Sequence, residues 1–150
     1  MSLNEEVDLL RNIPLFAKLE PSKLKLLAFA SERVIFPEGQ ELFHQGDPGD
    51  SAYVILKGEA DVIIATPTGD ITVARLGKND IIGEIAILCD VPRTATLRAV
   101  GELTTLAISK ELFFRMVSEF PQMAIEIMRE LAQRLERTNQ QLREAIAGKR

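Results

Sequence analysis

Two residues of opposite charge, Glu84 and Arg93, lie in a segment that is otherwise mostly small and apolar, residues 83–96. A guanidinium presents a planar fork of N–H donors that suits two phosphate oxygens, and a carboxylate accepts hydrogen bonds from a sugar hydroxyl. Gly83 lets the backbone approach a ligand closely, and a short helical turn over residues 85–88 would point free N–H groups at an anion. The segment therefore predicts a site for ribose and phosphate. The competing interpretation is a surface ion pair, which contributes under about 1 kcal/mol.

The rest of the chain supplies the elements that would position this segment. Before residue 31 apolar residues recur at helical spacing, and Pro21 is typical of a helix start. Between residues 33 and 109 the pattern changes to short β-rich runs that alternate with turn signals, Lys57-Gly58 among them. After Ser109, a candidate N-cap, helical spacing returns and is interrupted once, at Phe120-Pro121. The expected strands include residues 34–36, 52–56, 60–65, 71–76 and 103–108.

This order of elements predicts a mainly β protein with flanking α-helices: an antiparallel β jelly-roll barrel with N-terminal helices and a C-terminal helix pair. With 150 residues, 46% of them hydrophobic, the chain has room for one core. We therefore expect a single domain over residues 1–150. Its parts are N-terminal helices over about 1–31, the barrel over 33–109 with the segment 83–96 inside it, and C-terminal helices over 110–147.

Composition excludes several classes of function. The net charge of −4 and the pI near 5.1 argue against binding nucleic acid, because the surface as a whole repels a polyanion. The absence of a leader and of a long apolar run argues against a membrane role and, with the single Cys89, favours the cytoplasm. One His and one Cys are too few for a zinc, haem or iron–sulfur site, and they argue against a metal-dependent barrel enzyme. We expect no enzyme activity, no metal and no cofactor.

The segment 83–96 resembles the phosphate-binding cassette of the cyclic nucleotide-binding domain family. That cassette reads Gly-Glu-[Leu/Ile]-Ala, a short spacer, then Pro-Arg-[Thr/Ser/Ala]-Ala-[Thr/Ser], and this chain matches it at every position. The stretches 46–50, 53–58 and 76–83 also look like the turns and strands of the family's barrel. The resemblance thus covers nearly the whole chain and implies a sensor for a purine 3′,5′-cyclic monophosphate.

The resemblance also implies a role for individual residues. Glu84 would bind the ribose 2′-hydroxyl, and Arg93 would bind the exocyclic phosphate oxygens. The rest of the cassette would complete the cradle, largely through its backbone, and three apolar residues would form the wall around the sugar and the base. The cradle residues are Gly83, Ile85, Ala86, Thr94 and Ala95, and the wall residues are Val62, Val73 and Ile82.

The choice of nucleotide depends on two further places. Thr94 resembles the threonine of cyclic-GMP-dependent kinases, which favours cyclic GMP. The stretch 134–139, however, looks like the Arg-Leu-x-x-Thr-Ser stretch of the bacterial catabolite activator, whose threonine and serine contact adenine. Thr138 and Asn139 would then contact the base, and we favour cyclic AMP over cyclic GMP. The alternative is that Thr138 and Asn139 set the register of a paired helix.

An apolar stripe runs along the long C-terminal helix, from Ala124 through Leu131 to Leu142. We expect the part up to about Leu131 to pack on the barrel and the rest to pair with a second copy, which would make a homodimer. Ligand binding would move this helix about the break at Phe120-Pro121.

Two other interpretations remain open. The chain could be the ligand-sensing half of a catabolite-activator-type transcription regulator without its DNA-binding domain. More remotely, it could be a metal-independent barrel protein with no nucleotide ligand. The sequence also leaves open whether the chain comes from a regulator, a channel, a transporter or a kinase, or stands alone.

Overall fold

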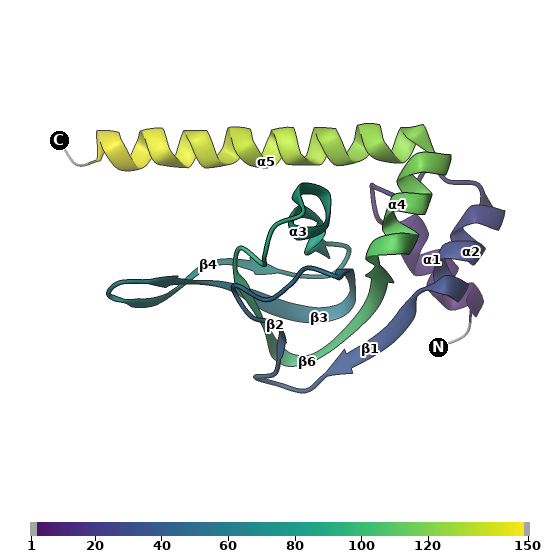
Figure 1. Cartoon of the computed structure of the whole chain (residues 1–150), viewed down its shortest axis with the longest axis horizontal. Coiled ribbons are helices and arrows are strands. Elements are labelled where there is room, and N and C mark those ends of the chain that lie inside the picture. The colour runs from purple at the N-terminus through teal and green to yellow at the C-terminus, as the bar shows by residue number, and fades with distance from the viewer. Residues whose placement is uncertain (1–2, 149–150) are drawn as a thin grey trace.

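The first two helices, α1 (Leu3–Arg11) and α2 (Pro21–Ala30), pack on each other at one end of a β-barrel (Figure 1). This computed structural model describes residues 3–148, apart from the side chain of Ile85. α2 begins at Pro21, whose fixed φ suits the first helical position. Both helices lie where the apolar spacing predicts them.

The barrel is one antiparallel sheet that is interrupted by a short helix. Its six strands have the order β1-β6-β3-β4, with β2 paired to β6 and β5 paired to β3. The helix α3 (Glu84–Cys89) follows β5 directly. The predicted fold class, mainly antiparallel β with flanking helices, is confirmed. The strands are β1 (Glu32–Phe36), β2 (Glu41–Phe43), β3 (Ser51–Thr66), β4 (Gly69–Leu76), β5 (Ile81–Ile82) and β6 (Thr96–Ser109).

The predicted turn at Lys57-Gly58 is wrong. The chain passes through this point as part of β3, and the pairing of β3 with β6 shifts register on both sides of Lys57. Gly58 has φ +98°, and a Cβ there would lie 2.6 Å from the carbonyl oxygen of Glu102. The glycine therefore marks a bulge where two strands approach closely, a role that local sequence does not distinguish from a turn.

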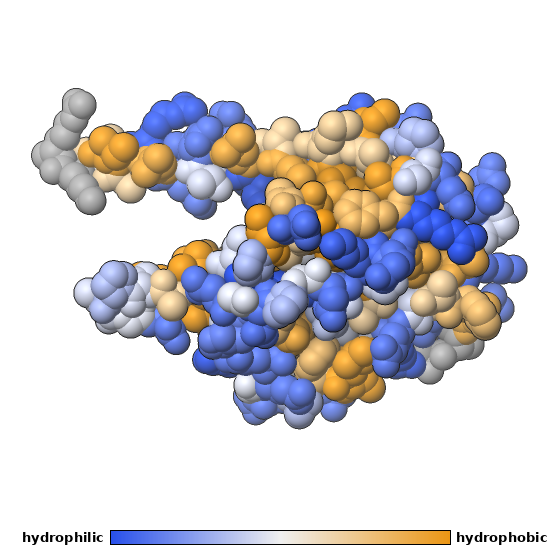
Figure 2. Space-filling model, in the orientation of Figure 1, coloured by the Kyte–Doolittle hydropathy of each residue, from blue (hydrophilic) through white to orange (hydrophobic). Residues whose placement is uncertain are grey.

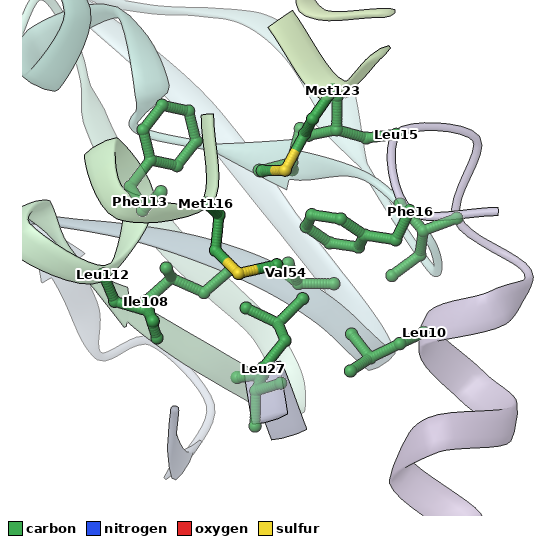
Figure 3. Packing of buried hydrophobic residues seen from close by; sticks show 14 of the residues in the cluster. Leu10, Leu15, Phe16, Leu27, Val54, Ile108, Leu112, Phe113, Met116 and Met123 are labelled. Carbon is green, nitrogen blue, oxygen red and sulfur yellow. The ribbon is translucent and has the colours of Figure 1, made fainter. Parts of the chain in front are cut away.

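The largest core cluster joins both ends of the chain to the barrel. Phe16, from the segment after α1, lies near Met123 at the start of the last helix (Figure 3). Met116 and Phe113 come from α4 (Lys110–Glu119), and Val54 comes from β3. Each of these five side chains is nearly fully buried. This packing fixes where the last helix leaves the barrel.

The last helix, α5 (Pro121–Ala147), is 27 residues long and extends across the barrel above α3 and beyond it (Figure 1). Met123 and Ile127 are buried and Leu131 packs on the core, whereas Leu135 and Leu142 are 62% and 58% exposed. The expectation that the stripe packs against the rest of the domain up to about Leu131 is confirmed for Ile127 and Leu131 and is wrong for Met128. Met128, which also belongs to the stripe, is exposed.

Candidate functional site

A pocket of about 210 Å³ lies between the barrel, the cassette and α5. Figure 2 shows an open cleft between the far half of α5 and the hairpin of β3 and β4. The barrel contributes apolar side chains, the cassette contributes small and charged residues, and α5 contributes a single side chain. The barrel residues are Phe43, Val62, Ala74, Leu76, Ile81, Ile82 and Leu97. The cassette residues are Gly83, Glu84, Ala86, Arg93, Thr94, Ala95 and Thr96, and the residue from α5 is Arg134.

Arg93 is 3% exposed and is held by both its backbone and its side chain. Its backbone N–H donates to the Asp47 carbonyl at 2.8 Å, and its own carbonyl accepts from Gly46 N–H at 2.9 Å. The guanidinium donates from Nη1 to the Gly83 carbonyl at 3.0 Å and from Nη2 to the Ser51 carbonyl at 2.6 Å. The turn before β3 therefore anchors the cassette arginine.

One nitrogen of Arg93 has no hydrogen-bond partner. Its Nε is buried, and none of the residues that the structure describes accepts a hydrogen bond from it. A buried donor without an acceptor costs about 1–3 kcal/mol, so such groups call for an explanation. Burial lowers the pKa of Arg93, and the nearby charges of Asp50 and Glu84 are among those that oppose this effect. The side chain nevertheless stays cationic, as arginine does in proteins. Arg93 is therefore a fixed positive group that lines the pocket.

Gly83 is required for the position of Arg93. It has φ +89°, a left-handed conformation that favours glycine, and it directly precedes α3. A Cβ at this position would lie 2.5 Å from Arg93 Nη1 and 3.1 Å from the Ser51 carbonyl oxygen. A side chain at residue 83 and the observed guanidinium position are therefore incompatible.

Glu84 is only 4% exposed and pairs with α5. Arg134 donates from Nη1 to its Oε1 at 2.9 Å, across 50 positions of sequence. The Arg134 side chain is 44% exposed, so solvent screens the pair from that side. Within the described part of the chain, Arg134 is the sole residue after Leu131 that is not exposed. The far half of α5 thus touches the site through this one side chain.

Arg134 is a site residue that the sequence analysis missed. It belongs to the stretch 134–139, which drew attention only to Thr138 and Asn139. The available signal was its position: Arg134 follows Glu130 and Leu131, one turn beyond the point where the stripe leaves the barrel. Burial raises the pKa of Glu130. The positive charge of Arg134 lowers this pKa, and the negative charge of Glu84 raises it further. Arg134 thus lies among carboxyl groups at the edge of the pocket.

The remaining predicted site residues do not all line the pocket. Val62, Ile82 and the cassette residues Ala86, Thr94 and Ala95 line the pocket. Val73 does not: it is 52% exposed, whereas its neighbour Ala74 lines the pocket, because side chains alternate along a strand. Ile85 lies in α3, and its side chain is outside the described residues.

Thr138 and Asn139 lie outside the pocket in this structure. Both are exposed, and the Thr138 hydroxyl donates to the Arg134 carbonyl at 2.9 Å, one turn back along α5. Contact between these residues and a nucleotide base therefore stays a prediction, and it requires α5 to approach the barrel.

Chemically, the pocket combines two cations and one carboxylate with apolar walls. This combination suits the binding of a small anion with an apolar part.

Comparison with known proteins gives the class of this domain. The model of the family "Cyclic nucleotide-binding domain" matches residues 33–120. The chain belongs to the cyclic nucleotide-binding domain family, and it is a cyclic-nucleotide-binding regulatory domain related to both transcription regulators and kinase regulatory subunits.

The individual relatives come from distant organisms. The chain is 29% identical over 140 residues to the "CRP-like cAMP-activated global transcriptional regulator" of Mycobacterium tuberculosis, covering 93% of this chain and 62% of that protein. It is 38% identical over 109 residues to the "cAMP-dependent protein kinase regulatory subunit" of Blastocladiella emersonii, covering 72% and 27%. The crystal structure of the Thermus thermophilus catabolite activator protein superposes with a TM-score of 0.79 at 29% identity, covering 86% and 61%. The chain thus spans less than two thirds of each of these relatives.

Within residues 3–148, none of the helices combines the length and the apolar composition that a membrane span needs. The same residues contain no cluster of three or more His, Cys, Asp or Glu side chains with the geometry of a metal site.

Proposed function

We propose that this domain senses a purine 3′,5′-cyclic monophosphate and favours cyclic AMP over cyclic GMP. Arg93 binds the phosphate, Glu84 accepts a hydrogen bond from the ribose hydroxyl, and the apolar walls hold the base. The observation that carries this proposal is the buried Arg93, which lines the same pocket as the buried carboxylate of Glu84 and keeps one nitrogen, Nε, without an acceptor. An anionic ester with a neighbouring hydroxyl satisfies both groups at once.

The charge of the pocket supports a cyclic diester over an open monophosphate. The charged residues that line the pocket are two arginines and one glutamate, which leaves an excess of one positive charge. A cyclic phosphodiester carries a single negative charge, whereas 5′-AMP is close to a dianion at neutral pH. The cyclic ester therefore balances the pocket. The preference for cyclic AMP is supported by the names of the two relatives, one cAMP-activated and one cAMP-dependent.

Calorimetric titration tests this ligand assignment. We expect cyclic AMP to bind more tightly than cyclic GMP, and both to bind at least about tenfold more tightly than 5′-AMP, a difference of about 1.4 kcal/mol. A preference for cyclic GMP would overturn the choice of base. Equal binding of 5′-AMP and cyclic AMP would overturn the charge argument.

Arg134 is the structural basis for a second part of the proposal, which is coupling of the ligand to α5. The ribose hydroxyl and Arg134 share one acceptor, Glu84, so a ligand changes the contact that holds the far half of the helix. A ligand shifts a conformation only through contacts that differ between two states, and the Arg134–Glu84 pair is the contact that we expect to differ. Movement would take place at Phe120, the residue between α4 and α5, and at Pro121, where α5 begins.

Hydrogen exchange of residues 121–142 measures this coupling. We expect cyclic AMP to change their exchange in the parent protein, and Arg134→Ala to abolish most of that change while Arg93 still binds ligand. The matched control is Arg137→Ala, on the same helix, because Arg137 is exposed and does not line the pocket. If the response of α5 survives in Arg134→Ala, the coupling does not run through this pair.

We further propose that the exposed stripe of α5 pairs with a second copy of the chain. Met128, Leu135 and Leu142 are spaced by seven residues, the heptad spacing of a coiled coil, and each is more than half exposed. Ile146 extends the exposed apolar surface by one more turn. Pairing would remove this surface from water.

Sedimentation at tens of micromolar protein tests the pairing. We expect a dimer for the parent chain and a monomer for the double variant Leu135→Lys/Leu142→Lys. The double variant Gln133→Lys/Gln140→Lys adds the same charge two residues earlier, off the stripe, and should remain a dimer. A monomeric parent, with and without cyclic AMP, would contradict the proposal.

The whole protein is proposed to be a cytoplasmic regulator without enzyme activity. The alternative of a catabolite-activator-type sensor half is supported by the two bacterial relatives, in each of which the match covers about three fifths of the length. Such a protein would bind DNA through a part that lies outside this match.

A further inference from the structure

The Arg93 guanidinium lies over an aromatic ring. Its Cζ is 4.1 Å from the centroid of Phe43, at the end of β2. A guanidinium within about 6 Å of a ring centroid is attracted to the ring, and its planar shape allows stacking. The two residues are also linked through the backbone, because the turn that holds Arg93 begins directly after Phe43. Phe43 itself lines the pocket.

Phe43 belongs to a row of three rings that hold one another. Its centroid is 6.2 Å from that of Tyr53 on β3, with 33° between the planes. Tyr53 in turn meets Phe36 of β1 edge to face, at 6.0 Å and 74°. Aromatic pairs at such distances are attractive in tilted and edge-to-face arrangements. The ring beneath Arg93 therefore belongs to an aromatic row whose three members come from β1, β2 and β3.

The ring restrains a rotation that the hydrogen bonds leave free. The bonds from Nη1 to Gly83 and from Nη2 to Ser51 hold one edge of the guanidinium. Two contacts define an axis, and rotation about that axis would swing the opposite edge, which carries Nε. The Phe43 ring, 4.1 Å from Cζ, opposes this rotation, together with the side-chain stem to which Nε is bonded. The direction of the Nε–H therefore depends in part on Phe43.

We propose that Phe43 is a positioning residue for Arg93: its ring fixes the plane in which the guanidinium meets the phosphate of the bound nucleotide. This inference rests on the proposed function, because the ligand is the one proposed above. It adds that phosphate affinity depends on a side chain outside the cassette. Leucine at position 43 would preserve an apolar wall but not the stacking face.

The first test compares Phe43→Leu with Phe43→Tyr in calorimetric titrations with cyclic AMP. We expect leucine to weaken binding by roughly fivefold to tenfold, the size of a partly buried cation–π contact, and tyrosine to stay within about twofold of the parent. If Phe43→Leu does not fold, as judged by thermal unfolding, Phe43→Met replaces it as a flexible apolar side chain. Parent-like binding by the leucine or methionine variant overturns the proposal.

A double-mutant cycle with Arg93→Ala separates positioning from a direct contact. If Phe43 acts through Arg93, Phe43→Leu should have no further effect on cyclic AMP binding once the guanidinium is gone. If Phe43 only packs against sugar or base, the two losses should add. Additive losses overturn the proposal.

The ligand-free protein supplies a readout that does not depend on the proposed function. Ring current from Phe43 should shift the NMR resonance of Arg93 Nε–H upfield in the parent and in Phe43→Tyr, and Phe43→Leu should lose the shift. An unchanged resonance in Phe43→Leu overturns the stacking itself. If the parent binds neither cyclic AMP nor cyclic GMP, the proposed function fails, and so does the inference that Phe43 orients Arg93 toward a nucleotide. This measurement still decides whether Phe43 orients Arg93 in the ligand-free protein.

Discussion

Arg93→Ala should weaken cyclic AMP binding by about 2 to 4 kcal/mol, which is roughly 30- to 1000-fold. The substitution removes the buried cation of the pocket together with its spare donor. Arg93→Lys should recover only part of the loss, because an ammonium keeps the charge but not the planar fork. Calorimetry with cyclic AMP measures both variants.

Arg93→Ala also has a structural cost, which the experiment must separate from the ligand contact. The Gly83 and Ser51 carbonyls lose their donors, and unsatisfied buried acceptors cost about 1–3 kcal/mol in unfolding free energy. Thermal unfolding of each variant measures this part. Arg98→Ala is the control, because Arg98 is exposed, pairs with Glu41 and does not line the pocket. If folded Arg93→Ala binds cyclic AMP as the parent does, Arg93 is not the phosphate ligand.

Gly83→Ala should lower both stability and affinity. A left-handed φ costs a non-glycine residue roughly 1–2 kcal/mol, and the new Cβ would collide with Arg93 Nη1. The guanidinium must then shift, which we expect to weaken cyclic AMP binding by at least about tenfold, or about 1.4 kcal/mol. Chemical denaturation and calorimetry measure the two effects.

Gly39→Ala is the matched control for the backbone cost. Gly39 has φ +82°, close to that of Gly83, but a Cβ there would meet nothing within 4 Å. It should therefore lose a similar conformational free energy and keep parent-like affinity. Equal affinities of Gly83→Ala and Gly39→Ala for cyclic AMP would show that the close approach of residue 83 to Arg93 has no part in binding.

Much of the fold could be predicted because its signals are local. Pro21 and Pro121 both begin helices, as their position in the sequence predicted. The alternation of β-rich runs with turns predicted the barrel. The short strands β2 and β5 were missed, because segments of three and two residues are too short to show an alternating pattern. Gly58 was misinterpreted for a different reason: a glycine with positive φ serves a turn and a bulge equally well, and only the pairing partner distinguishes them.

By itself, the sequence determined the cassette, because Gly83, Glu84 and Arg93 lie within one short segment whose residue types carry their own chemistry. Tertiary structure alone decided which distant side chains meet that segment: Arg134 on Glu84, and Phe43 beneath Arg93. The physical reason is that the Arg134 contact depends on the angle at which α5 leaves the core, and the Phe43 contact depends on the position of the strand beside the pocket. Packing and pairing between residues far apart in sequence set that angle and that position.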